Sequence, residues 1–488
     1  MGYIPCTGSN TDSLDGVATM QEIQRLIREI EVYCRRCGIA ESTFGRQAIN
    51  DGKFVSRLRQ GKGVTVKTLD RIRAFLHGHP PGGSTAQPSE AGAAQPDSSG
   101  PHPGSSPGDT TTPLPQRPFR FYDNRQKYLA FITTCNEKST IARRCGKELP
   151  HLQPQPPALR VFDAGMGDAT LLSLLMRDLH RRFSTVPLLV VAKEISLEDV
   201  RLGLEKMPDR FFEHPATVLV ITNLHYAEAP KLMPADVHTA AALNWHEIRL
   251  EGDCAYAYGE QIEALEPLLS DGWQTRTSAK SGNPLYVRPS VLVLYRQDHK
   301  FLLDAVIPRP GYFQGHYDFV VASQPWRARM DAEFKARRIL APLTRSLAPG
   351  GRLLAIQGSG EDPGTEIIQA IWPRENPFRV NRHQLISTLK EVLGRQARDY
   401  NFNALADHRS RLRYSMHTLP SEIGENIGTS TLFAAWNAAI YVNQIEDARL
   451  EQALADGRYL EATRAVLHQR GGLWFNDETF VISRRRQK

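Results

Sequence analysis

The chain has 488 residues, 41% of them hydrophobic, and its 60 Lys and Arg against 53 Asp and Glu give a formal net charge of +7. This length predicts more than one domain, and no apolar run approaches the ~20 residues that a membrane-spanning helix needs. Six cysteines in so long a chain exclude a dense disulfide framework, and the lack of a signal-peptide pattern indicates a cytoplasmic location.

A small all-α domain is predicted for residues 20–78. Apolar residues at helical spacing in 20–38, followed by short helical segments joined by Gly and Asn turns, resemble the repressor-type helix-turn-helix family. Lys and Arg dominate residues 53–73, which suits contact with DNA phosphates. The residues on the predicted recognition helix are Lys53, Ser56, Arg57 and Arg59. The alternative is a solvated basic face on a protein-interaction module.

A linker is predicted for residues 79–118, which are rich in Pro, Gly, Ser and Thr and nearly free of aliphatic residues. Such a composition cannot bury a core, so we expect it to be disordered. The second domain then spans residues 119–488.

A glycine-bearing turn follows the first apolar strand of this domain, in Leu-Arg-Val-Phe-Asp-Ala-Gly-Met-Gly-Asp-Ala-Thr at 159–170. Asp163 ends the strand, and Gly165 and Gly167 let a ligand approach the backbone in front of a helix N-terminus. The pattern lacks the third glycine of a dinucleotide fingerprint, where Thr170 stands, and is not a Walker motif.

What remains, Asp-x-Gly-x-Gly, resembles motif I of the class I S-adenosylmethionine (SAM) dependent methyltransferases. The resemblance implies that Asp163, Gly165 and Gly167 hold the amino-acid end and ribose of SAM. Ala169 replaces the third glycine of the family, which is a departure from its motif.

Two further apolar strands are predicted at 187–194 and 217–223. Glu194 ends the first, where a carboxylate can accept both ribose hydroxyl protons. Asn223 ends the second and is predicted to face the adenine. Continuous apolar runs of this kind are typical of parallel strands that are buried on both faces.

A fourth strand at 317–322 runs into Ser323-Gln-Pro-Trp326, and Leu-Ala-Pro-Gly-Gly-Arg-Leu-Leu-Ala-Ile at 347–356 resembles the turn and fifth strand of the same family. The predicted fold is therefore α/β: a doubly wound, mostly parallel, seven-stranded-type sheet like that of Rossmann-like methyltransferases, with the separate all-α domain before it. Two strands near 412–418 and 473–483 are expected to complete the sheet as a hairpin-like pair.

Ser323-Gln-Pro-Trp resembles the [N/D/S]-x-P-[Y/F/W] motif of methyltransferases that modify planar amines of nucleobases or glutamine. The resemblance implies a catalytic set in which an oxygen acceptor and a backbone carbonyl bind the –NH₂ while an aromatic ring stacks on it. The predicted residues are Ser323, Pro325 and Trp326; Gln324 departs from the usual residue. The alternative is a strand-end turn with a packing tryptophan.

Two segments are predicted to lie near the acceptor and SAM. An insertion at about 225–316 is expected to cover the strand ends and build much of the acceptor pocket. Before the first strand, Tyr122, Tyr128 and Asn136 are lid candidates or plain packing and capping residues.

The predicted function is SAM-dependent methyl transfer to a planar amine, with a nucleic-acid base as one such acceptor. The alternatives are a methyltransferase acting on a small molecule or protein, and a DNA-binding regulator that senses SAM without turnover. No metal is predicted, because Cys34-Arg-Arg-Cys37 has no second pair of ligands. Methyl transfer requires mainly alignment in a dry pocket.

Overall fold

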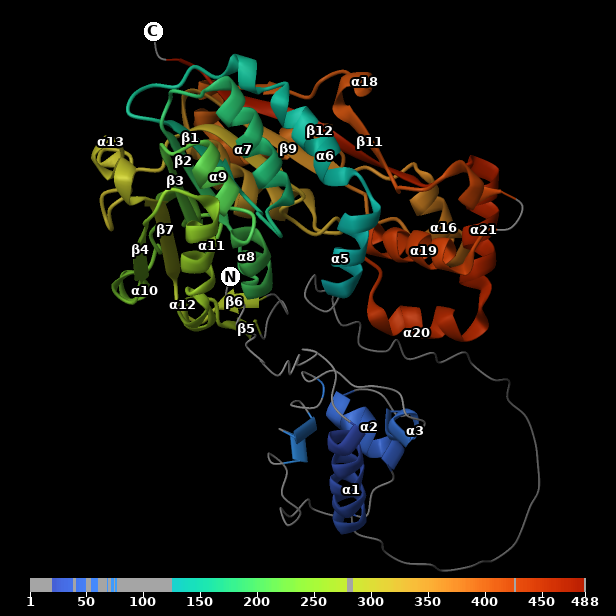
Figure 1. Ribbon diagram of the computed structural model, residues 1–488. Coiled ribbons are helices and arrows are strands. Elements are labelled where there is room, and N and C mark those ends of the chain that lie inside the picture. The colour runs from blue at the N-terminus through green and yellow to red at the C-terminus, as the bar shows by residue number, and fades with distance from the viewer. Residues whose placement is uncertain are drawn as a thin grey trace, which may run out of the picture. The chain divides into compact units, whose positions relative to one another are not determined.

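The computed structural model describes residues 20–37, 41–49, 54–59, 68, 72–73, 75–76, 125–278, 284–424 and 427–486. The chain divides into two compact units, Met1–Asp109 and Thr110–Lys488, drawn in Figure 1. The predicted linker at 79–118 lies outside the described residues.

The described part of the first unit is helical. Its helices are α1 (Met20–Cys37), α2 (Glu41–Ile49) and α3 (Phe54–Arg59). Leu26 and Ile30, one turn apart on α1, share a buried cluster with Phe44 of α2. Helix α1 agrees with the helical spacing of 20–38, whereas the helix-turn-helix stays a prediction because its turn at 50–53 lies outside the described residues.

A ten-stranded sheet forms the centre of the second unit. Five parallel strands occupy its middle in the order β3-β2-β1-β8-β9. Their bounds are Thr217–Thr222 (β3), Leu188–Lys193 (β2), Leu159–Asp163 (β1), Tyr317–Ser323 (β8) and Leu347–Gly358 (β9). The antiparallel β12 (Trp474–Arg484) follows β9, and β10 (Tyr400–Asn403) forms the edge. This arrangement confirms the predicted α/β class with a mostly parallel central sheet.

The C-terminal strands differ in part from the prediction. Strand β11 (Arg411–Ser415) pairs with β12 as expected. The same long β12 also pairs with β9 and β10, because its buried residues run along the whole strand. The edge strand is therefore β10, which the sequence analysis missed.

The predicted insertion contributes strands to the sheet. Strand β7 (Ser290–Arg296) pairs antiparallel with β3, and β4 (Asn244–Leu250) continues the sheet beyond β7. A separate hairpin is formed by β5 (Thr275–Thr277) and β6 (Pro284–Tyr286). The expectation that the insertion mainly covers the strand ends is wrong for β4 and β7, because the fully buried residues of β7 are core of the sheet itself.

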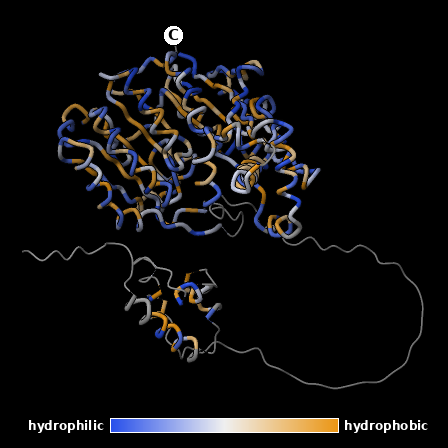
Figure 2. Tube along the Cα trace, turned by 45° about the vertical axis from the view of Figure 1, so that its right-hand side comes forward, coloured by the Kyte–Doolittle hydropathy of each residue, from blue (hydrophilic) through white to orange (hydrophobic). Residues whose placement is uncertain are grey.

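Helices cover both faces of the sheet. Adjacent residues of β1 illustrate the alternation, since Val161 packs into one core and Phe162 into the other. The first core includes α6 (Glu137–Gly146), α7 (Thr170–Arg182), α8 (Leu197–Leu204), α9 (Pro208–Glu213), α11 (Ala255–Glu263) and α12 (Glu266–Gly272). The second includes α13 (Lys300–Leu303), the π-helix η5 (Ala336–Leu340), α15 (Ala341–Arg345) and α17 (Arg382–Leu393). Helix α14 (Ala332–Lys335) directly precedes η5. Figure 2 shows the hydrophobic strands between these layers.

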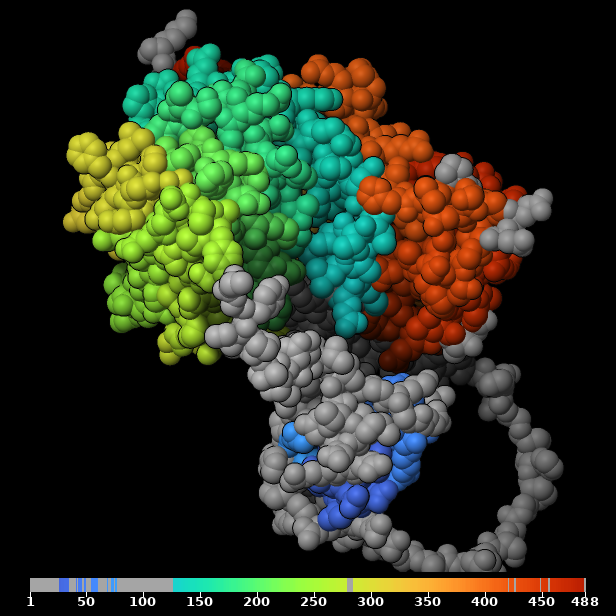
Figure 3. Space-filling model, viewed as in Figure 1, coloured from blue at the N-terminus to red at the C-terminus, as the bar shows by residue number. Residues whose placement is uncertain are grey.

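A third core holds a helical group beside the end of β12 (Figure 1), and the C-terminal helices of this group form the red-orange surface in Figure 3. It consists of α5 (Arg125–Thr134), α16 (Pro363–Ile371), α19 (Thr429–Asn443), α20 (Asp447–Asp456) and α21 (Arg458–Arg470). Gly457, at φ 70°, separates α20 from α21. Short turns complete the second unit: η2 (Leu149–His151), η3 (Ala229–Lys231), α10 (Val237–Ala241), η4 (Gln297–His299), η6 (Gly394–Asp399), α18 (Asp407–Ser410) and η7 (Pro420–Ile423). No helix in the described ranges is long and apolar enough to cross a membrane.

The order of the strands places a crevice beside β1. From β1 the chain builds β2 and β3 on one side, then returns to β8 on the other side of β1. In open α/β sheets ligands bind at such a reversal, outside the carboxyl ends of the strands. The carboxyl ends of β1, β2 and β8 are therefore where the predicted site must be assessed.

Candidate active site

The glycine turn is attached to strands on both sides of β1. Ala164 N donates a hydrogen bond to Val321 O of β8 at 2.9 Å, and Met166 N donates to Lys193 O of β2 at 3.0 Å. The start of the turn therefore spans the point where the strand order reverses.

Gly165 presents an open backbone at this point. Its N–H donates to Asp163 Oδ1 at 3.2 Å, and a Cβ built on Gly165 would meet no protein atom within 4 Å. A side chain here would fill space beside the turn without disturbing the protein, as expected of a ligand-facing glycine.

Gly167 is needed for a different reason. It adopts a left-handed φ of 54°, and a Cβ would lie 2.8 Å from the Tyr128 hydroxyl. Its N–H donates to Glu194 Oε2 at 2.8 Å. The turn thus reaches from Asp163 to the end of β2, and it brings the four residues predicted from motif I and β2 into one site.

The Glu194 carboxylate is held by backbone groups. Oε1 accepts hydrogen bonds from the N–H groups of Ile195 at 2.7 Å and Ser196 at 2.9 Å. Trp273 Nε1 donates to the Glu194 carbonyl at 2.9 Å and packs α12 behind it. These contacts orient both carboxylate oxygens before any ligand binds.

Asp163 is an anion in an unfavourable environment. Burial raises its pKa to about 6, the Gly165 N–H and the Lys138 ammonium oppose this rise, and the Glu194 charge adds to it. Asp163 is 1% exposed. A cationic group bound next to it would relieve this cost.

Lys138 is a residue that the sequence analysis missed. Its Nζ lies 2.9 Å from Glu137 Oε2. Burial lowers its pKa, but the carboxylates of Glu137, Asp168 and Asp477 raise it overall. The ammonium group therefore belongs to the electrostatics of this crevice. Only the packing of α6 onto the sheet reveals it, because one lysine on a helix gives no sequence signal.

Helix α5 contributes Tyr128, one of the lid candidates. Its hydroxyl donates to Asp168 Oδ1 at 2.9 Å, and burial together with the Asp168 charge raises the pKa of Tyr128 well above its usual value. Lys206 Nζ donates to the Asp168 carbonyl at 2.5 Å from the opposite side. Tyr128 thus lies against the glycine turn, as a closing residue would.

Asn136, a second lid candidate, contacts β11 and not this turn. Asn136 Oδ1 accepts a hydrogen bond from Ser415 N at 2.8 Å, which fastens the start of α6 to β11. This contact favours the packing role that the sequence left open, since Asn136 precedes α6 but its side chain makes no capping hydrogen bond to that helix. Tyr122 lies outside the described residues.

Asn223 has a structural environment rather than a ligand-facing one. Its Nδ2 donates to Gly272 O and Arg288 O, each at 2.9 Å, and its Oδ1 accepts from Ser290 N at 2.8 Å. The side chain is 1% exposed. The predicted contact with adenine is not supported, because these backbone groups already satisfy the amide and join β3 to β7.

The residues after β8 are held by contacts within the protein. Trp326 is 4% exposed, and its Nε1 donates to Gln357 Oε1 at 3.2 Å. The Pro325 carbonyl accepts from the Tyr226 hydroxyl at 2.9 Å. Trp326 packs into the second core, and its ring also lines a small cavity with Gln324 and Lys335, so its stacking role stays a prediction. Ser323 is half-buried at the strand end.

Gln324 links this strand end to two buried carboxylates. It has a left-handed φ of 48°, and its Nε2 donates to Glu137 Oε1 and to Asp477 Oδ2, each at 3.1 Å. Burial and the Glu137 charge raise the pKa of Asp477 well above its usual value. Within the described part of the chain, the buried Asp477 Oδ1 and the hydroxyl of Tyr414 have no hydrogen-bond partner. Asp477 is not among the site residues predicted from the sequence.

Among the described residues, no group of three or more His, Cys, Asp or Glu is arranged to hold a metal ion.

In the first unit, Ser56 and Arg57 are exposed on α3. Arg59, predicted to contact DNA, instead forms ion pairs of 2.6 Å with both Glu31 and Glu41. Its guanidinium joins α3 to α1 and α2, so a primary role in DNA contact is not supported. Lys53 lies outside the described residues.

No protein-family model matches the chain, and no curated protein matches it. Solved structures show a weak likeness. The "putative sarcosine dimethylglycine methyltransferase" of Galdieria sulphuraria is 10% identical, with 72% of this chain and 86% of that chain covered and a TM-score of 0.29. A geranyl diphosphate methyltransferase in complex with GPP and sinefungin is 13% identical, with 71% and 77% covered and a TM-score of 0.26.

PKMT2 from Rickettsia typhi is 11% identical, with 77% of this chain and 56% of that chain covered and a TM-score of 0.25. All of these TM-scores are low. The strand order and the contacts of the glycine turn are features of this chain itself and do not depend on these similarities.

Proposed function

We propose that this chain is a SAM-dependent methyltransferase. The observation that carries the proposal is the hydrogen bond of 2.8 Å from Gly167 N to Glu194 Oε2, which joins the glycine turn after β1 to the acid after β2 at the reversal of strand order. The motif resemblance and the strand order β3-β2-β1-β8-β9-β12-β10 support the same assignment.

The residues of the crevice fit SAM by their chemistry. Glu194 has carboxylate oxygens suited to the ribose hydroxyls, Gly165 has an open backbone, and Asp163 favours a cationic neighbour. Lys138 offers an ammonium group for the carboxylate of the amino-acid end. When bound, SAM supplies a methyl group on a positively charged sulfonium. The protein's own contribution is to orient the acceptor and to exclude water, with Tyr128 closing over the turn.

For the acceptor we propose an amine, and specifically a planar one as the Ser323 motif suggests. Ser323 and the carboxylates of Glu137 and Asp477 are hydrogen-bond acceptors suited to an N–H group. When an –NH₂ nitrogen forms its bond to the methyl carbon and the carbon–sulfur bond breaks, the nitrogen must release one proton. Asp477 is a suitable base, since burial makes its carboxylate a stronger base than an exposed one.

A nucleic-acid base is one acceptor of this kind, and the first unit supplies the reason to test it. We propose that Ser56 and Arg57 on α3 contact DNA. The stacking ring that a flipped base was predicted to use, Trp326, is buried in the core, so this version rests on α3 and on Ser323.

The decisive experiment measures SAM binding and methyl transfer separately. Calorimetry with purified protein tests binding, and labelled SAM with unmodified DNA tests transfer, with Ser323→Ala and Asp477→Asn as variants. Incorporation that is lost in the variants while SAM still binds supports a DNA amine methyltransferase. Binding without incorporation redirects the search to small-molecule and protein amines, and turnover of none of them favours a SAM-sensing regulator. Absence of SAM binding overturns the proposal.

A further inference from the structure

A second concave site lies away from the crevice, between α6, η2, the loop that leads from β10 to β11, and the strands β9 and β12. The cavity has a volume of about 390 Å³, within the range of small-molecule sites. Its lining shares no residue with the glycine turn or with the cluster around Gln324. Figure 1 shows α6 and α18 on the same part of the molecule.

The floor of this cavity is an ion triad, in which Arg144 and Glu148 are buried and Arg352 is half-buried. Arg144 Nη1 donates to Glu148 Oε1 at 2.7 Å, and Arg352 donates to Glu148 Oε2 through Nε at 2.8 Å and Nη2 at 2.6 Å. Although burial raises the pKa of Glu148, the two guanidinium groups hold it below its usual value. Two guanidinium groups and one carboxylate leave the triad with a net positive charge. Both oxygens of Glu148 already accept hydrogen bonds from the arginines.

The rim adds further cations, one of which, Arg411, is paired with Glu361 at 3.2 Å. Lys and Arg in the lining number five, against Glu148 as the one acid. Lys147 and Arg409 are exposed, and their side chains have no ion-pair partner among the described residues. The remaining polar and apolar lining residues are His151, Asn403, Leu405, His408, Arg411, Leu412 and Val481.

We propose that this cavity binds a small ligand with several closely spaced phosphate groups. Converging Arg and Lys side chains are the usual recognition chemistry for phosphate, and Arg adds bidentate geometry. The enclosed volume fits a short polyphosphate, free or as part of a nucleotide, better than an extended nucleic-acid strand, which would need a groove. The inference is independent of the proposed methyl transfer, because it uses none of the same residues.

Titration calorimetry on the full chain at low salt tests the site, with inorganic tripolyphosphate and ATP as separate probes. We expect saturable binding of tripolyphosphate to the wild type. The double variant Lys147→Glu, Arg409→Glu should bind at least about tenfold more weakly, because two attractive charges become repulsive. Equal affinity for both probes means that the phosphates are the recognised chemistry, and tighter ATP binding means that the ligand is a nucleotide; both support the site.

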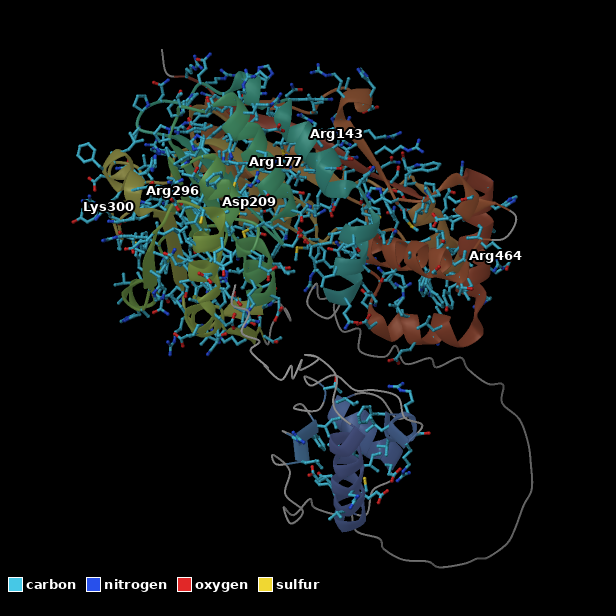
Figure 4. The ribbon with its side chains drawn as sticks, in the orientation of Figure 1. Arg143, Arg177, Asp209, Arg296, Lys300 and Arg464 are labelled. Carbon is cyan, nitrogen blue, oxygen red and sulfur yellow. The ribbon has the colours of Figure 1, made fainter. Side chains whose placement is uncertain are left out.

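The control is Arg143→Glu, Arg177→Glu, which changes the net charge by the same amount at positions outside the cavity (Figure 4). Arg143 lies on the same helix as Arg144, and Arg177 is exposed on α7. The control should bind like the wild type, and circular dichroism should show both variants folded. Absence of saturable binding to either probe, or equal losses in the two double variants, would overturn the proposal. So would binding of single-stranded DNA in place of both probes.

Discussion

Asp163 in the crevice and Glu148 in the basic cavity are both buried carboxylates, yet their surroundings move their pKa values in opposite directions. Burial dominates at Asp163 and raises its pKa to about 6. Two arginines outweigh burial at Glu148 and lower its pKa. Asp163 therefore lacks a cationic partner close enough to offset its burial. Glu148 already has two such partners, Arg144 and Arg352. Electrostatic strain of this kind is typical of a carboxylate that meets a ligand, whereas the paired Glu148 holds two arginines in place.

The largest expected effect is on the paired carboxylate. Glu148→Gln should lower the free energy of unfolding by about 3 kcal/mol, because Arg144 and Arg352 would lose their shared anion. Urea unfolding at neutral pH measures this. Since the native pKa of Glu148 is lowered, its stabilisation is present above its usual value of 4.5 and is lost as the pH falls below it. Glu366→Gln, at an exposed pair with Arg470, is the control and should cost less than about 1 kcal/mol. Equal losses of unfolding free energy in the two variants would show that the Glu148 pairs stabilise the fold no more than an exposed ion pair does.

At the crevice, Gly165→Val should weaken SAM binding at least about 100-fold, or ~2.7 kcal/mol. The new side chain would fill the ligand's space while meeting no protein atom, so the thermal midpoint should stay near that of the wild type. Gly165→Ala should give an intermediate loss. SAM affinity within about threefold of the wild type would show that Gly165 does not face the ligand.

Asp163→Asn should raise the free energy of unfolding of the ligand-free protein by about 1–3 kcal/mol at pH 8. A pKa raised from 3.8 to about 6 means that protonation stabilises the fold. That contribution is present below pH 3.8 and is lost as the pH rises through 6. The difference between variant and wild type should therefore shrink toward zero when unfolding is repeated in acid. A variant less stable than the wild type at pH 8 would show that the ionised Asp163 does not destabilise the ligand-free fold.

Asn223→Ala should destabilise the second unit by about 1–3 kcal/mol, because buried backbone groups of β7 and α12 would lose their partner. SAM affinity of the folded variant, measured by calorimetry well below its unfolding temperature, should be unchanged. A large loss of SAM affinity with unchanged stability would instead support the contact between Asn223 and adenine that the sequence predicted.

The smallest effects concern α3. Arg57→Ala should lower the salt dependence of DNA binding by about one phosphate contact, whereas Arg59→Ala should change it less, because Arg59 is held by Glu31 and Glu41. Fluorescence anisotropy across a salt series measures both. Identical slopes for the two variants would show that the ion pairs do not decide which arginine reaches DNA.

Local patterns carried most of the fold prediction. Continuous apolar runs in β1, β2, β3 and β8 each need burial on both faces, so a parallel sheet with helices on either side follows from them. Strand β10 was missed because its alternation of aromatic and Asn residues extends over only four residues, the shortest run that indicates a strand. Its place at the edge depends on pairing with β12, a contact far away in the chain.

For the site, the sequence alone determined the residues that must lie at strand ends: Asp163, Gly165, Gly167 and Glu194 each follow a predicted strand, and parallel strands end at one edge. Tertiary structure decided everything that depends on packing between distant segments. It brought Lys138 and Asp477 into the crevice, buried Trp326, used Asn223 to join strands, and assembled the basic cavity from residues between 144 and 481. The physical reason is that burial and charge pairing depend on which elements pack together, and spacing along the chain does not encode that.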